Sequence, residues 1–323
     1  MVESKKIITL EKAKELAAHG WHAADLHVHT RYSYDVLPSP LLNPVVLYEK
    51  GRMKGLRFIT FTDHDTMEAY DHIGWEREGL VPGVEIKIRD RRRVGHTLHI
   101  NVYQLNRVQF GELTAIAKQE KDIELFLRYL ADHDLPHIYN HPYWFEAHER
   151  PSYSVINDLI RRFPVTEYNM HRVMQKNNVT FALAERYGKG IVAATDTHAG
   201  DIGRAFTLAR GETFRDFYEN IKRGDSLLVP RDLTIGLLKH EINTWIELIF
   251  AIDMDVFEKT KFTGTFWIDQ LIITLARGTL KEYPRMWKAA NYFFSTLSKS
   301  GAPAFFYVKT QHLKARKMKR HLR

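Results

Sequence analysis

The sequence contains no cysteine. This absence excludes structural disulfides, thiolate metal sites and a cysteine nucleophile, so any bound metal ion must be held by nitrogen and oxygen. Long apolar runs are also missing, because the most apolar segments, such as 245–257 and 266–276, are short or interrupted by acids. We therefore expect no membrane-spanning helix. Residues 1–20 carry scattered charge and lack the apolar stretch of a secretory signal, which predicts a cytoplasmic location.

Histidine is plentiful, with 17 residues in a chain of 323, and the 44% hydrophobic content is enough for a substantial core. The net charge of +8 is unevenly distributed. Residues 240–323 hold 14 Lys and Arg against 7 Asp and Glu, which leaves 33 against 32 for residues 1–239. The basic character therefore belongs to the C-terminal part, whereas the rest of the chain is nearly neutral.

Short β-rich runs alternate with amphipathic segments from about residue 20 to 235, a pattern typical of an α/β domain with a mainly parallel sheet. The predicted strands include 23–28, 56–62, 80–88, 96–103, 137–140, 165–169 and 190–196. Predicted helices between them include 43–55 and 112–134. The number of alternations favours a barrel over a small open sheet.

Beyond residue 236 the alternation stops, and the sequence predicts helices rich in aromatic residues. We therefore divide the chain into a barrel domain, 1–236, and a helical, basic C-terminal extension, 237–323. Gly301 is expected to end one of the helices of this extension.

Polar side chains cluster where the predicted strands end. In an α/β barrel the C-terminal ends of the strands converge on one mouth. His27 and His29 alternate along a strand, so their rings point to the same face and can bind one ion such as Zn, Mn or Fe. The other residues of this kind are Asp63, His64, Glu85, His141, Asp196 and His198.

An ordered set of motifs makes the prediction more specific. They are DLHVHTRYSYD (25–35), FTDHDT (61–66), PGVEI (82–86), GHTLHI (95–100), NHP (140–142) and TDTH (195–198). Together they resemble the PHP family, the polymerase and histidinol phosphatase superfamily of metal-dependent phosphoesterases, over about residues 23–210. The resemblance implies a distorted, TIM-like (βα)7 barrel whose mouth holds two or three divalent metal ions.

The resemblance also implies three sets of metal ligands. One ion would be held by His27, His29, Glu85 and Asp196; a second by Glu85, His99 and His141; a third by Asp35, His64 and His198. His96 and His99 both lie in the fourth motif, and the LHI context favours His99. Asp63 and Asp65 flank His64 and are candidates to orient it.

The chemistry implied is phosphate-ester hydrolysis by a hydroxide that bridges two ions, with Asp196, His198 and Glu85 as the catalytic ligands. Arg204 is the leading candidate to hold the phosphate, and Arg172 and the 91–93 arginines are further candidates. His171 lies at a mouth position and is a weaker candidate for substrate contact. The expected substrate is a phosphate monoester of a small metabolite or a nucleotide.

Two alternatives remain open. A nuclease that trims short RNA or DNA would use the basic C-terminal extension, where 14 aromatic residues are interleaved with the basic excess, to bind nucleic acid. A catalytically silent, metal-binding regulatory module is the other, although no predicted ligand is missing. The sequence leaves the oligomeric state undetermined.

Overall fold

The computed structural model describes residues 5–146, 149, 151–251, 266–276 and 282–321. Among these residues, nine strands form one sheet in the order β7-β6-β5-β4-β3-β2-β1-β8-β9. The strands are β1 (His22–Asp25), β2 (Leu56–Phe61), β3 (Leu80–Ile88), β4 (Leu98–Tyr103), β5 (His137–Tyr139), β6 (Val165–Asn169), β7 (Gly190–Ala194), β8 (Phe206–Ala209) and β9 (Ser226–Val229).

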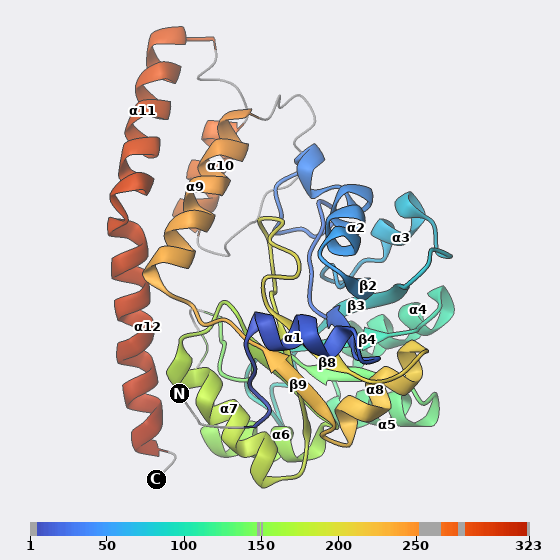
Figure 1. The fold of residues 1–323 in the computed structure, drawn as a ribbon. Helices are drawn as coiled ribbons and strands as arrows, with labels where there is room; N and C mark the ends of the chain where they lie inside the picture. The colour runs from blue at the N-terminus through green and yellow to red at the C-terminus, as the bar shows by residue number, and fades with distance from the viewer. Residues whose placement is uncertain (1–4, 147–148, 150, 252–265, 277–281, 322–323) are drawn as a thin grey trace.

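Helices follow most strands and cover the outside of the sheet (Figure 1). In the barrel they are α1 (Leu10–Ala17), η1 (Pro40–Leu42), α2 (Pro44–Met53), α3 (Glu68–Ile73), α4 (Arg107–Ala115), η2 (Ile116–Glu120), α5 (Ile123–Asp132), α6 (Tyr153–Arg162), α7 (Met174–Arg186) and α8 (Phe214–Lys222). In the extension they are α9 (Ile235–Ala251), α10 (Phe266–Ala276), α11 (Pro284–Ser300) and α12 (Ala302–His321). The predicted α/β barrel with a helical C-terminal extension is thus confirmed.

The sheet closes on itself beyond the ends of β1 and β7. Val28 and Thr197 form a parallel bridge there, and the Asp196 N–H donates to the His27 carbonyl at 2.8 Å. This closure carries the HxH segment and the TDTH segment side by side. It is the reason that two motifs about 170 residues apart in sequence meet at one mouth.

Helix α8 fills the opposite end of the barrel. Its apolar residues recur at the three- and four-residue spacing of one helical face, Phe214, Phe217, Tyr218 and Ile221, and they pack against interior side chains such as Phe58. The approach is close, because a side chain at Gly190 would lie 2.4 Å from the Ile221 carbonyl oxygen. That end is therefore solid core, and chemistry is confined to the mouth.

Two strands, β8 and β9, are only four residues long each and were not among the predicted strands. Two expectations about the barrel need correction. The predicted mainly parallel sheet is mixed, because β4 runs antiparallel to both β3 and β5. The single helix expected at 112–134 is interrupted by Lys121, whose φ of 54° is left-handed, and Asp122 caps α5 anew.

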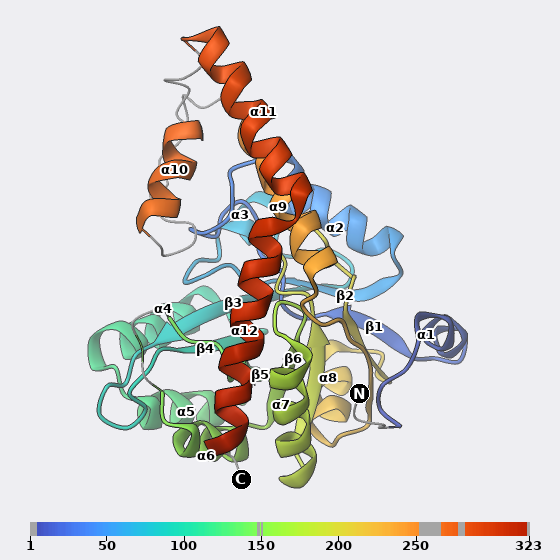
Figure 2. The same cartoon turned by 90° about the vertical axis from the view of Figure 1, so that its left-hand side faces the viewer.

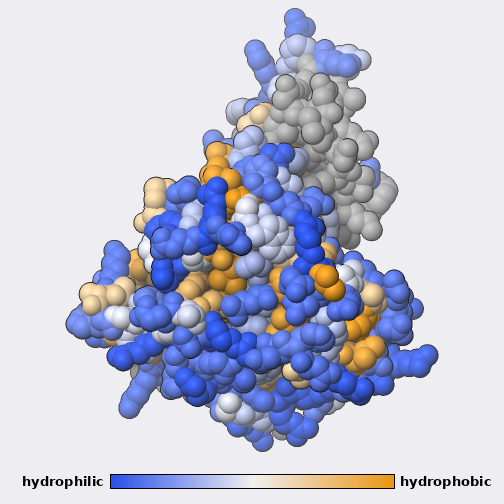
Figure 3. Space-filling model, turned by 90° about the vertical axis from the view of Figure 1, so that its right-hand side faces the viewer, coloured by the Kyte–Doolittle hydropathy of each residue, from blue (hydrophilic) through white to orange (hydrophobic). Residues whose placement is uncertain are grey.

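Helix α12 runs along one side of the barrel against α7, α11 continues from it beyond the barrel, and α9 packs against both (Figures 1 and 2). Gly301 separates α11 from α12 in the left-handed conformation, as expected. In the described part of the chain, no helix combines the length and the apolarity that crossing a bilayer requires. Figure 3 shows a mostly hydrophilic face on the side of the barrel opposite α12, with small scattered hydrophobic areas.

Candidate metal centre

All nine predicted ligands meet at the mouth of the barrel. Their ligand atoms fall into overlapping groups whose members lie within 4.8 Å of one another. The groups are His29, Asp35, His64 and His198; His27, Glu85 and His141; His27, His29 and Asp196; His64, Glu85 and His99; and His171, Asp196 and His198. His171 is thus a tenth member that the predicted ligand set did not contain.

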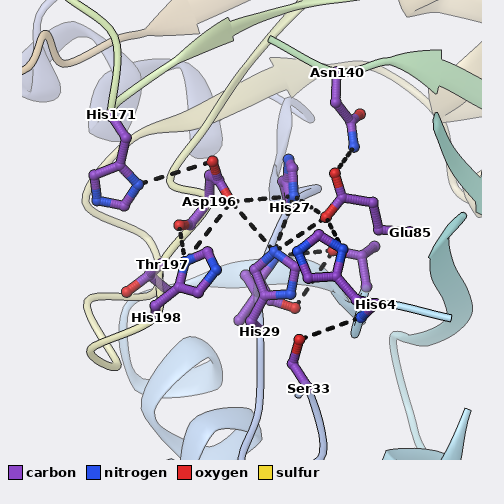
Figure 4. A network of polar contacts seen from close by, with 12 residues as sticks. His27, His29, Ser33, His64, Glu85, Asn140, His171, Asp196, Thr197 and His198 are labelled. Carbon is purple, nitrogen blue, oxygen red and sulfur yellow. Dashed lines mark hydrogen bonds and ion pairs between the residues drawn. The ribbon is translucent and has the colours of Figure 1, made fainter. Parts of the chain in front are cut away.

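Glu85 lies at the middle of this arrangement (Figure 4). Its side chain is fully buried, and each carboxylate oxygen faces different histidines. Five ring nitrogens surround it, at 3.2 Å (His27), 3.3 Å (His29), 3.0 Å (His64), 2.8 Å (His99) and 3.4 Å (His141). A carboxylate with histidines on both oxygens could share one oxygen with each of two ions if both were bound.

Asp196 and Asp35 each face two of the predicted histidine ligands. Asp196 Oδ1 is 3.2 Å from both His27 Nε2 and His29 Nε2. Asp35 Oδ2 is 3.1 Å from His64 Nε2 and 3.1 Å from His198 Nε2. The structure therefore brings each of the three predicted ligand sets together.

The donor set fits divalent metal ions. His27 Nε2 and His29 Nε2 converge to 3.1 Å of each other, with the Glu85 and Asp196 oxygens beside them. Buried nitrogens and carboxylate oxygens that point to a common place suit Zn, Mn or Fe. Burial alone would raise the pKa of the Glu85 carboxyl. The surrounding imidazole rings, with His64 contributing most, instead hold that pKa well below its usual range.

The ligands are held by a layer of buried polar residues that were not among the predicted site residues. Glu167 accepts from His27 Nδ1 at 2.8 Å, so that His27 Nε2 is turned toward the centre. Asn140 donates to Glu85 Oε1 at 2.9 Å, and Asn169 donates to Asp196 Oδ2 at 3.1 Å. Such outer partners fix the ring tautomer and the carboxylate rotamer. The available signal was the polar pair Glu167 and Asn169, two residues apart in an otherwise buried strand.

The two aspartates that flank His64 make other bonds. Asp63 accepts from both the backbone N–H and the hydroxyl of Thr30 at 2.6 Å, which fixes the turn after the HxH segment. Asp65 accepts from Lys118 at 2.8 Å. Their predicted role in orienting His64 stays a prediction, since the carboxylates that face its ring nitrogens are Asp35 and Glu85.

The candidate arginines separate clearly. Arg172 lies at the centre, with Nη2 3.6 Å from Asp196 Oδ2 and its guanidinium 5.7 Å from the Trp144 ring centroid. Arg204 instead pairs with Asp201 at 2.9 Å. Arg93 pairs with Asp90 and Asp122, on α5's side of the barrel. Arg172 is therefore the arginine that the structure places against a ligand, and the role of Arg204 in holding phosphate stays a prediction.

His171 is held by the extension. Its Nε2 lies 2.6 Å from Glu241 Oε1 on α9, and its Nδ1 lies 3.9 Å from Asp196 Oδ2 (Figure 4). Burial opposes a charge on this ring, yet Glu241 and Asp196 outweigh burial and raise the pKa of His171 to about 10. The His171 ring thus faces Glu241 with one nitrogen and Asp196 with the other.

Comparisons with known proteins identify similar structures. No family model and no curated protein matches the chain. A two-domain protein from Bacteroides vulgatus, described as containing a predicted PHP-like metal-dependent phosphoesterase, matches 69% of this chain and 70% of its own at 15% identity and a TM-score of 0.47. PsfC from Pseudomonas syringae matches 69% and 96% at 12% identity and a TM-score of 0.49. The lesion-specific endonuclease PfuEndoQ from Pyrococcus furiosus matches 64% and 57% at 16% identity and a TM-score of 0.41.

The neighbouring histidines His96 and His99 provide a test of the second ligand set. His99 Nδ1 faces Glu85, whereas His96 Nδ1 lies 3.2 Å from the Val94 carbonyl and its ring packs edge-on against Phe145. Both side chains are buried. We expect His99→Gln to weaken the binding of one metal equivalent at least about tenfold, because loss of even an outer partner of a ligand costs that much.

The matched control is His96→Gln, which removes an equally buried ring three residues away. Metal titration against a chelator, with the bound metal counted by mass spectrometry, measures both variants. Equal metal affinity in the two variants would contradict the assignment of His99.

Proposed function

We propose that this protein is a metal-dependent phosphoesterase that hydrolyses a phosphate monoester of a small metabolite or a nucleotide. The observation that carries the proposal is the mouth itself, where buried histidines and carboxylates from separate motifs meet around Glu85. Two ions held close together there would activate water at neutral pH and stabilise charge on the attacking and leaving oxygens.

The residues of the chain supply the remaining requirements. Glu167 and Asn140 hold His27 and Glu85 in fixed orientations, which keeps the ligands in place without reorganisation during turnover. Arg172 presents a cation next to Asp196, where it can hold a phosphate oxygen. The Trp144 ring lies against both His99 and Arg172, so it limits the movement of that guanidinium.

A second candidate function is supported by the surface of the extension. Phe305, Phe306 and Tyr307 on α12 are exposed, at 45%, 66% and 45%, and Lys309 lies 5.7 Å from the Phe305 ring centroid. Exposed aromatic rings beside basic side chains can stack bases and contact phosphates. The same centre would then act as a nuclease on short RNA or DNA.

One experiment tests both candidates. The purified protein is stripped of metal, reloaded separately with Zn, Mn or Fe, and assayed against phosphate monoesters, p-nitrophenyl phosphate and short oligonucleotides. We expect monoester hydrolysis that disappears on chelation and returns on reloading. Oligonucleotide cleavage without monoester turnover would replace the first proposal with the second, and a metal-bound protein that cleaves neither would point to the regulatory module.

A further inference from the structure

The C-terminal extension reaches the centre through one buried carboxylate. Glu241 lies in the second turn of α9 and is only 8% exposed. A buried carboxylate is costly unless it is paired, and its partner here is the barrel residue His171, at 2.6 Å. The pair joins a helix outside the predicted barrel domain to a loop of the barrel mouth.

The loop that carries His171 is fixed from its other side as well. Directly after β6, the His171 N–H donates to the Asn169 side-chain oxygen at 2.8 Å, and Asn169 also donates to Asp196. Backbone and ring are therefore both held, and Figure 4 shows the ring pointing toward Asp196. The arrangement parallels that of His27, whose ring is held by Glu167 on one nitrogen and faces the centre with the other.

Helix α9 is itself anchored, so Glu241 is a stable support. Leu237 on α9 packs with Met170 and Val173 of the loop around His171 and with Val308 of α12. Farther along α9, Leu248 and Ile249 pack against the loop that carries Asp35. The extension therefore packs on the loops at two sides of the mouth, and Glu241 is the residue through which it contacts His171.

The two carboxylate oxygens of Asp196 face different groups, and one of them faces the His171 ring. Its Oδ1 faces the metal histidines, whereas Oδ2 faces His171 and the guanidinium of Arg172. The His171 ring and the Arg172 guanidinium therefore present nitrogen atoms to the Asp196 oxygen that the metal histidines do not face. An oxyanion bound at the centre would meet these nitrogen atoms.

We propose that Glu241 is a positioning residue, supplied by the extension, that holds His171 as a contact for an oxygen of a phosphate bound at the centre. The inference rests on the proposed function for the identity of the anion. It assigns the extension to the active site and makes it part of substrate binding rather than a separate module.

The test measures binding of inorganic phosphate to the metal-loaded full chain by calorimetry, together with bound metal and the kcat and KM for p-nitrophenyl phosphate. Glu241→Gln is expected to raise the phosphate Kd and the KM about tenfold, with bound metal unchanged. The matched control is Glu247→Gln, an exposed carboxylate on the same helix, which is expected to bind phosphate like the wild type.

A double-mutant cycle shows whether Glu241 acts through His171. His171→Gln should weaken phosphate binding to a similar extent, and the double variant should lose no more than His171→Gln alone. Three outcomes would each overturn the inference. They are additive losses in the double variant, a Glu241→Gln protein that binds phosphate like Glu247→Gln, and loss of metal in step with loss of phosphate binding. If Glu241→Gln does not fold, Glu241→Asp, which shortens the side chain, must weaken phosphate binding for the inference to stand.

The outcomes for the inference and for the proposed function are separable. A wild-type protein that binds phosphate with the expected Glu241 dependence, but hydrolyses no phosphoester, would reject the proposed function alone. A wild-type protein that hydrolyses phosphoesters with no dependence on Glu241 would reject the inference alone.

Discussion

A Glu85→Gln protein is expected to fold, to lose at least one equivalent of bound metal, and to retain no more than about a thousandth of the wild-type kcat. Glu85 is the fully buried residue around which five histidine nitrogens are arranged. An amide of the same size removes the negative charge that two ions would share. Loss of about 4 kcal/mol of transition-state stabilisation corresponds to about a thousandfold in rate.

The control for this prediction is a buried carboxylate outside the centre. Asp90 is 2% exposed and accepts from the backbone N–H groups of Arg92 and Arg93. We expect Asp90→Asn to lower the melting temperature while metal content and kcat per folded molecule stay unchanged. Metal analysis, thermal unfolding and steady-state kinetics measure these properties for both variants. A Glu85→Gln enzyme with more than about a tenth of the wild-type kcat would contradict the assignment of Glu85 as the central metal ligand.

An Asp196→Asn protein is also expected to lose almost all turnover, with a kcat about a thousandfold or more below that of the wild type. Asn is the informative replacement, because Asp196 has a φ of 52°. Asn tolerates this left-handed conformation, whereas Ala would add roughly 1 kcal/mol of backbone strain. Any loss in the Asn variant can therefore be attributed to the missing carboxylate charge between His27 and His29.

Asp134 offers a control with the same backbone conformation, since its φ is 49°, and its exposed carboxylate pairs with Arg215 far from the mouth. Asp134→Asn should leave kcat, KM and bound metal unchanged. Steady-state kinetics on metal-saturated protein compare the pair. Comparable activity in the Asp196→Asn and Asp134→Asn enzymes would remove Asp196 from the catalytic ligands.

Glu85 and Asp196, the residues of these two predictions, were both identified as metal ligands from the sequence motifs. His27 and Asp196 lie just beyond the ends of β1 and β7, and parallel strands bring such positions to one mouth whatever their separation in sequence. Glu85 lies inside β3, where it forms a bridge with His64 beyond the end of β2. His99 followed from the family resemblance alone. In the structure it reaches the mouth near the beginning of β4, because β4 runs antiparallel to β3 and His99 pairs with Lys87.

Other features could not be read from local pattern. The residues around Lys121 look like a continuous amphipathic helix, but tertiary packing selects a left-handed residue there and starts a new helix at Asp122. Arg204 was the leading candidate for an anion ligand and Arg172 a further one, and only the fold shows that Arg204 meets Asp201 while Arg172 meets Asp196. Long, flexible arginine side chains leave their partner undetermined until the surrounding chain is placed.

The sequence by itself determined the nitrogen and oxygen character of the site and the α/β barrel pattern, because the absence of cysteine and the alternation of strands and helices are local facts. Asp35 and His99 entered the set of nine residues through the family resemblance. Only the tertiary structure decided how these residues are supported and completed. Glu241 carries no local sign of its role, and the local pattern around Glu167 and Asn140 does not show which ligand each one holds. A hydrogen bond across 140 residues, as between His27 and Glu167, depends on which strands and helices become neighbours. Residue types define the chemistry available to this chain, and packing defines which of them meet.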